Sequence, residues 1–237
     1  MLHTTRAIAL KTVRHGDNTI VLKALTEGLG TRSILVRTGR KGGVSAASLQ
    51  PLNRLEVVVQ ESGERELLSA RELRVAEPYE RLPFDAVRGT LALFVQEVLY
   101  RTLRGESADP ELYAFVEGAL HAMDRSPDVR HFPLVFLLRY SEMLGFLPAT
   151  PGPEERWFDP REGEFMARGQ HHGHLMGPPL SDHLAAMLSV GFDRMEALNI
   201  PAGQRRGLLD HLLLYFRMHI EGLGELRSPS VLHEVLG

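Results

Sequence analysis

The chain of 237 residues contains no cysteine. Disulfide bonds, thiolate zinc sites, iron–sulfur clusters and cysteine nucleophiles are therefore excluded. No apolar run reaches the roughly 18 residues that a membrane-spanning helix needs. The N-terminal "MLHTTRAIAL" lacks the basic segment and long apolar core of a secretion signal. We therefore expect a cytoplasmic protein without a membrane partner.

Aromatic residues are absent from the first third of the chain, since residues 1–78 contain no Phe, Tyr or Trp. Acidic residues are also scarce there: residues 1–55 contain only Asp17 and Glu27, against nine Lys and Arg. Residues 1–81 carry 13 Lys+Arg and 9 Asp+Glu, whereas residues 82–237 carry 14 and 21. A basic N-terminal segment joined to an acidic remainder indicates a polyanionic partner such as nucleic acid.

Short segments rich in β-branched residues, separated by turn clusters, fill the first 75 residues. They predict strands over Arg6–Val13, Thr19–Leu25, Arg32–Arg37, Leu49–Gln60 and Arg65–Arg74, the last being a strand or a short helix. Five short strands in this length predict a small closed barrel of the OB type, because closure removes exposed strand edges.

The pattern changes after "EPYERLP" (Glu77–Pro83), where apolar residues recur at three- and four-residue steps typical of helices. Asp109–Pro110 has the form of a helix N-cap followed by proline. The segment Thr150–Pro179 is rich in proline and interrupts the helices, and Trp157–Ala167 within it resembles a small β-hairpin. We therefore predict an α+β protein with an OB-fold nucleic-acid-binding domain at 1–80 and an α-helical domain at 81–237. A hairpin or loop insertion lies at about 150–180.

The stretch "RTGRKGG" (Arg37–Gly43) holds three cations and three glycines directly after a predicted strand. Its glycines lack the G-x-x-x-x-G-K-[ST] and G-x-G-x-x-G spacings that cradle phosphates, which leaves a polar turn or a basic finger beside the barrel. Cations concentrated in the same unit favour the finger. The candidate nucleic-acid-binding residues are Lys11, Arg14, Lys23, Arg32, Arg37, Arg40 and Lys41. Without aromatics in the barrel, binding should be mainly electrostatic and salt-sensitive.

Two further clusters have alternative interpretations. The segment "HHGH" (His171, His172, His174), with Asp182 nearby, could bind a transition metal, but it lacks the His-x-x-x-His helix of hydrolytic zinc sites. Exposed loop histidines are the simpler interpretation. Arg205–Arg206 could form an interaction patch or a solvated first helical turn. No nucleophile motif is present, so we predict a protein that is not an enzyme and needs no cofactor.

Several segments occur in the order and spacing of a known family. They are "HGDNTIVLKALTEGLGTRSILVRTGRKG" (His15–Gly42), "LQPLNRLEVVV" (Leu49–Val59), "ADPELYAFVEGAL" (Ala108–Leu120), "FLLRYSEMLGFLP" (Phe136–Pro148) and "LRSPSVLHEVL" (Leu226–Leu236). The chain thereby resembles the RecO family of bacterial recombination mediators. Many members of that family carry a four-cysteine zinc module, whose place is taken here by the cysteine-free Trp157–Leu180.

The resemblance implies binding of single- and double-stranded DNA, annealing of complementary strands, and help in loading recombinase during gap repair. It implies RecR and single-stranded-DNA-binding protein as partners, the latter through its C-terminal tail, and an association with the nucleoid. Two alternatives remain. One is a protein-interaction scaffold based on the acidic helical domain; the other is a metal hydrolase based on His171, His172, His174 and Asp182.

Overall fold

The computed structural model describes residues 1–39, 44–60, 67–103, 105, 107–167 and 173–235. Contacts divide the chain into two compact units, Met1–Asp124 and Arg125–Gly237. The predicted domain boundary after residue 80 stays a prediction. The strands are β1 (Leu2–Gly16), β2 (Thr19–Thr26), β3 (Gly30–Arg37), β4 (Arg54–Gln60), β5 (Leu67–Val75), β6 (Trp157–Asp159) and β7 (Glu164–Met166). The helices are α1 (Ala86–Thr102), α2 (Pro110–Arg125), α3 (Phe132–Met143), α4 (Leu180–Met187), α5 (Ala202–His219) and α6 (Ser228–Val235).

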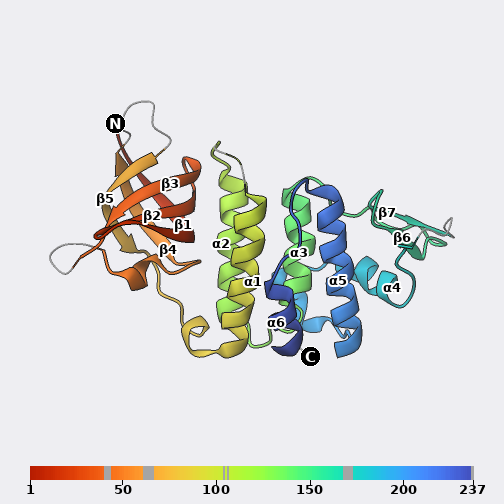
Figure 1. The fold of residues 1–237 in the computed structure, drawn as a ribbon. Helices are drawn as coiled ribbons and strands as arrows, with labels where there is room; N and C mark the ends of the chain where they lie inside the picture. The colour runs from red at the N-terminus through yellow and green to blue at the C-terminus, as the bar shows by residue number, and fades with distance from the viewer. Residues whose placement is uncertain (40–43, 61–66, 104, 106, 168–172, 236–237) are drawn as a thin grey trace. The chain divides into compact units, whose positions relative to one another are not determined.

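The first five strands form a closed barrel in the order β1-β2-β3-β5-β4 (Figure 1). The long strand β1 pairs with both β2 and β4, and a short parallel pairing of β3 with β5 closes the circle. Alternate residues point inwards, so Leu22, Ala24, Ile34 and Val36 join the buried barrel core. The prediction of a five-stranded OB-type barrel followed by helices is confirmed, and the ambiguous fifth segment is a strand.

The strand predicted over Leu49–Gln60 begins only at Arg54. Residues Ala46–Leu49 form a 3₁₀ helix instead. The chain then turns at Leu52, whose φ of 65° lies in the left-handed region. A strand cannot run through that backbone conformation, so the prediction was wrong for the first five of these twelve residues.

Helices α1 and α2 follow the barrel within the first unit. Asp85 caps α1 by accepting from the backbone N–H groups of Val87 and Arg88. The predicted cap at Asp109 is present, since its carboxylate accepts from the Leu112 N–H at 2.9 Å. Helix α1 packs against β1, and the Gln96 side chain donates to the Leu10 carbonyl at 2.8 Å. The outer side of β1 is thereby covered around Ile8 and Leu10, which are 0% exposed.

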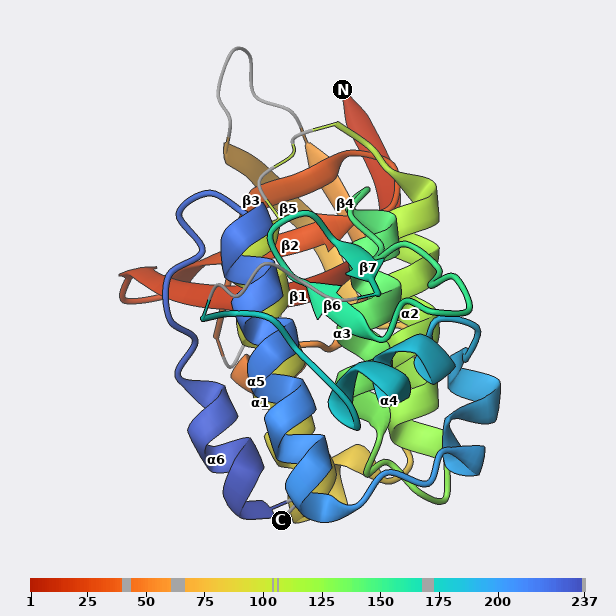
Figure 2. The same cartoon turned by 90° about the vertical axis from the view of Figure 1, so that its right-hand side faces the viewer.

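The second unit contains the remaining helices and a small two-stranded sheet. Helix α3 packs against α5, and α4 also contacts α5 (Figure 2). The predicted hairpin within Trp157–Ala167 is present as β6 and β7, paired antiparallel. Phe158 of this hairpin lies edge-on to Tyr215 of α5, with ring centroids 5.5 Å apart, which places the hairpin against that helix. Across the residues described above, no helix has the length and apolar character needed to span a bilayer.

Candidate nucleic-acid interface

The predicted cations of the barrel fall into distinct groups. Lys11 of β1 lies directly opposite Lys23 of β2. Their neighbours Leu22 and Ala24 point into the core, so Lys23 and its partner Lys11 lie on the outer face. Arg37 of β3 shares this outer face, because Ile34 and Val36 point inwards. Three of the predicted residues therefore lie on one side of neighbouring strands.

Tyr100 of α1 lies beside the two lysines. Its ring centroid is 4.5 Å from the Lys11 Nζ and 5.3 Å from the Lys23 Nζ. The Lys11 ammonium also donates to the Tyr100 hydroxyl at 3.4 Å. Cations are attracted to the negative face of an aromatic ring, so the ring stabilises two like charges that would otherwise repel each other across the strands. Sequence reasoning missed Tyr100, because it follows the barrel in the chain.

Arg14 and Arg32 lie at strand positions whose side chains do not share the outer face of Lys11 and Lys23. Arg14 pairs with Ile20, and Arg32 pairs with Ala24, which points into the barrel core. Arg14 is exposed near the end of the hairpin, whereas Arg32 is half-buried and donates to the Thr31 carbonyl at 3.4 Å. The structure does not bring these two arginines onto the face of Lys11 and Lys23. Arg40 and Lys41 lie outside the described residues.

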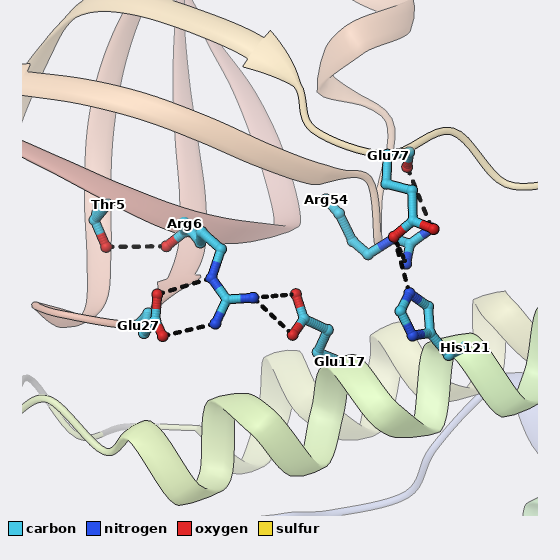
Figure 3. Close-up of polar contacts among 7 residues, drawn as sticks. All are labelled: Thr5, Arg6, Glu27, Arg54, Glu77, Glu117 and His121. Carbon is cyan, nitrogen blue, oxygen red and sulfur yellow. Dashed lines mark hydrogen bonds and ion pairs between the residues drawn. The ribbon is translucent and has the colours of Figure 1, made fainter.

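Other cations of the barrel are neutralised by carboxylates (Figure 3). Arg6 of β1 forms paired hydrogen bonds with Glu27, at 2.9 and 2.7 Å, and with Glu117 of α2, at 3.0 and 2.9 Å. These hydrogen bonds from Arg6 hold the pKa of Glu27 below its ordinary value. The almost fully buried Arg54 pairs with Glu77 at 2.8 Å, and Glu77 also accepts from His121 at 3.0 Å. These arginines fasten the helices and the linker to the barrel.

The outer-face lysines and Arg37 differ from Arg6 in their ion pairing. Within residues 1–39 and the other described segments, none of Lys11, Lys23 and Arg37 forms an ion pair with a carboxylate. Lys11 and Arg37 are exposed, and Lys23 is half-buried. Their positive charge is consequently available to an external polyanion. It could attract phosphate groups, although it provides no nucleophile or acid–base chemistry.

A second cationic feature lies in the second unit, where a groove forms between α3, α5 and α6. It is lined by Arg130, Pro133, Leu134, Arg205, Arg206, Leu209 and Leu232. Burial lowers the pKa of Arg205, and the charge of Arg130 lowers it further. The adjacent His131 is 4% exposed, and burial lowers its pKa below the ordinary value, with a further contribution from Arg205. Arg130 is paired with Asp128 at 2.6 Å. The positive charge of Arg205 and Arg206 beside leucine side chains suits an acidic peptide with apolar residues.

The histidine cluster gives no metal site that can be described. His171 and His172 lie outside the described residues, and His174 is exposed. Asp182 is engaged by Arg156, whose guanidinium forms two hydrogen bonds with that carboxylate. In the described part of the chain, no group of three or more His, Asp or Glu residues is arranged to hold a metal ion. The metal-hydrolase alternative therefore has no geometric support there.

Comparisons with known proteins agree with the barrel and the helices that follow it. The family described as Recombination protein O N terminal matches residues 1–79, and Recombination protein O C terminal matches residues 83–151. The protein named DNA repair protein RecO from Porphyromonas gingivalis is 31% identical over 240 residues, covering 98% of each chain. Proteins of the same name from Christiangramia forsetii and Flavobacterium psychrophilum are 29% and 26% identical, covering 100% and 98% of each chain. Because two family domains occur in order and the relatives match from end to end, this chain belongs to the RecO family of DNA repair proteins.

Proposed function

We propose that this RecO-family protein binds single- and double-stranded DNA through the outer face of its barrel. On this surface it anneals complementary strands and helps to load recombinase onto protein-coated single strands in gap repair. The observation that carries the proposal is a set of outer-face cations that pair with no carboxylate of the described residues: Lys11, Lys23 and Arg37. The outer face of the second and third strands is also where OB folds commonly bind oligonucleotides.

Annealing on such a surface needs no bond chemistry. Two DNA strands repel each other through their phosphates, and a cationic face that holds both lowers this repulsion. Each ammonium or guanidinium that neutralises a phosphate releases condensed counterions, so affinity falls steeply with salt. Arg14, exposed near the end of the β1–β2 hairpin, extends the positive surface beyond the outer face. Arg40 and Lys41 of the predicted basic finger belong to the same proposal on sequence grounds.

The salt dependence of single-strand binding tests this proposal. We expect the combined change Lys11→Gln, Lys23→Gln and Arg37→Gln to reduce the slope of log affinity against log salt. The expected reduction is about 2, because each lost phosphate contact removes about 0.7 on single strands. Arg74→Gln is the matched control, since Arg74 is an exposed barrel cation paired with Glu56. An unchanged slope in the triple variant would contradict the assignment, and a wild-type protein that does not bind DNA would favour the scaffold alternative.

We propose that the groove of the second unit binds the C-terminal tail of single-stranded-DNA-binding protein. Arg205 and Arg206 would pair with acidic side chains of the tail, and Leu134 and Leu209 would contact apolar ones. RecR is proposed as a further partner on family grounds, and no residues are assigned to it.

The two surfaces can be separated by comparing annealing of naked and protein-coated strands. Arg206→Gln should weaken binding of a tail peptide and slow annealing of coated strands, while annealing of naked strands stays unchanged. Lys11→Gln with Lys23→Gln should slow both reactions. If Arg206→Gln slowed annealing of naked and coated strands equally, this result would argue against a tail-binding groove.

A further inference from the structure

Tyr100 supplies an aromatic ring to a barrel that has none of its own. Residues 1–78 contain no aromatic side chain, and non-specific single-strand binders usually stack bases on aromatic rings. Helix α1 packs against β1 and carries Tyr100 to the outer face, where the ring lies 4.5 Å from the Lys11 Nζ. The ring is half-buried rather than enclosed. The folded protein therefore has an aromatic surface at a point where the barrel sequence has none.

The ring lies where two positive charges gather, and no carboxylate in the described segments forms an ion pair with either of them. Lys11 and Lys23 face each other across β1 and β2, and both ammonium groups lie over the same ring. Arg6, on the same strand, is held by Glu27 and by Glu117. A structural cation of this barrel thus has acidic partners, whereas among the described residues the two lysines contact Tyr100 and pair with no carboxylate. An incoming phosphate can draw the ammonium groups away without breaking an ion pair.

The surface next to the lysines is apolar. Val13 of β1, Val21 of β2 and Leu35 of β3 form the next outward row across the strands, and Val13 is 55% exposed. Arg37 follows on the same face, four residues beyond Ser33, the residue paired with Lys23. This separation is about 13 Å along the strand. A nucleic-acid strand crossing the face would meet cations on both sides of an apolar row.

We propose that Tyr100 is a base-stacking residue of this face. When a single strand binds, Lys11 and Lys23 leave the ring for the flanking phosphates, and a nucleobase takes their place on the phenol. Every base has a π-face, so the contact is tolerant of sequence. The inference rests on the proposed binding of single strands by the barrel and adds a contribution from the bases to one from the phosphates.

Paired oligonucleotides separate these contributions. The wild-type protein is titrated with a fluorescent oligothymidine and with a strand of the same length that lacks bases, at several salt concentrations. We expect tighter binding of oligothymidine by about 5- to 150-fold, the range for stacking one base. Tyr100→Leu should abolish this preference and leave the salt slope unchanged, whereas Tyr100→Phe should keep the preference. Lys11→Gln with Lys23→Gln should reduce the slope for both strands by about 1.4.

Each other result has a defined meaning. Tyr100→Leu could weaken binding of both oligonucleotides equally and reduce the salt slope. This result would mean that the ring only positions the lysines, and it would overturn the stacking proposal. An unchanged preference in Tyr100→Leu would overturn it as well. Failure of the proposed function is distinguishable, because wild-type binding would then be absent or its slope insensitive to the lysine changes. The melting temperature of each variant, compared with Tyr100→Phe, shows whether lost binding comes from lost folding.

Discussion

At the scale of single residues, Asp124 is a charged group with a structural task. Its side chain is 1% exposed. Oδ1 accepts from the backbone N–H groups of Arg81 and Leu82 at 2.9 and 2.8 Å, and Oδ2 accepts from that of Glu80 at 2.9 Å. Burial alone would raise its pKa, but these three donors outweigh it and hold the pKa below the ordinary value. The carboxylate thereby fixes the linker between barrel and helices.

We expect Asp124→Asn to destabilise the protein by about 2–4 kcal/mol. The amide keeps one acceptor oxygen and turns an NH₂ group towards backbone donors, so buried N–H groups lose their partners. Urea unfolding at neutral pH measures the loss. In the wild type, the lowered pKa stabilises the fold at pH values above the unfolded-state pKa of about 3.9. This stabilisation is lost as the pH falls through the folded-state pKa. Asp124→Asn should therefore show a weaker acid dependence, and an equal acid dependence in both proteins would contradict the assignment.

At the same scale, the sequence predicts which residues are cationic but not which of them remain available to bind an external anion. Arg6 and Lys11 lie five positions apart on one strand and look alike in the sequence. They differ because Glu117, 111 residues away, reaches Arg6. Lys11 instead meets Tyr100, 89 residues away. Partners at such separations depend on tertiary packing, which no local pattern encodes.

At the scale of elements, the β6–β7 hairpin is fastened to α5 without cysteine. Tyr215 of α5 donates to the Phe146 carbonyl at 2.6 Å, and burial raises its pKa to about 12. His219 Nε2 lies 3.0 Å from the Pro160 carbonyl oxygen in the hairpin turn. Gly163 in that turn has φ of 72°, and a Cβ there would lie 2.7 Å from the Tyr215 hydroxyl. Aromatic packing and hydrogen bonds therefore hold this segment.

Gly163→Ala should destabilise the second unit by about 1–3 kcal/mol. The left-handed backbone disfavours a Cβ, and the new methyl would displace a hydroxyl that is already hydrogen-bonded. Gly203→Ala in α5 is the control, since a Cβ there meets nothing within 4 Å. We expect this control to be neutral or slightly stabilising. Combining Gly163→Ala with Tyr215→Phe removes the close contact, so the double variant should lose less stability than the sum of the single changes. Thermal unfolding of all four variants measures this, and a harmless Gly163→Ala would refute the close approach.

Elements with strong local patterns were predictable and their ends were less so. The alternation of β1 to β4 and the apolar periodicity of the helices predict the correct element types. The break at Leu52 was not foreseen, because leucine rarely adopts positive φ. The parallel pairing of Ser33–Leu35 with Leu67–Ser69 joins segments more than 30 residues apart, and it could be expected only from the general need to close a barrel edge.

At the scale of the whole molecule, the barrel and its first two helices share one apolar layer. The side chains of Ile8 and Leu10 point out of the barrel but are 0% exposed, and the outward-pointing Leu25 is 2% exposed. Leu103 and Leu112 lie beside Leu25 in one pocket. A fragment that ends at residue 80 would expose this layer to water. The first compact unit accordingly extends to Asp124.

A fragment of residues 1–124 should unfold cooperatively and remain monodisperse, whereas residues 1–80 should aggregate and bind a hydrophobic dye. Exposed apolar patches of this kind promote association. Size-exclusion chromatography and thermal unfolding distinguish the two fragments. A fragment of residues 1–80 as stable as the longer one would instead support an independently folding barrel with a boundary at residue 80.

The position of β1 in the barrel has a consequence for synthesis on the ribosome. This strand is translated before its partners in the barrel, since β4 ends at Gln60 and the helix that packs against β1 begins at Ala86. A nascent chain must therefore keep Ile8 and Leu10 unshielded while about 80 further residues are translated. At about 5–20 residues per second this takes several seconds, during which the two apolar side chains stay exposed to water.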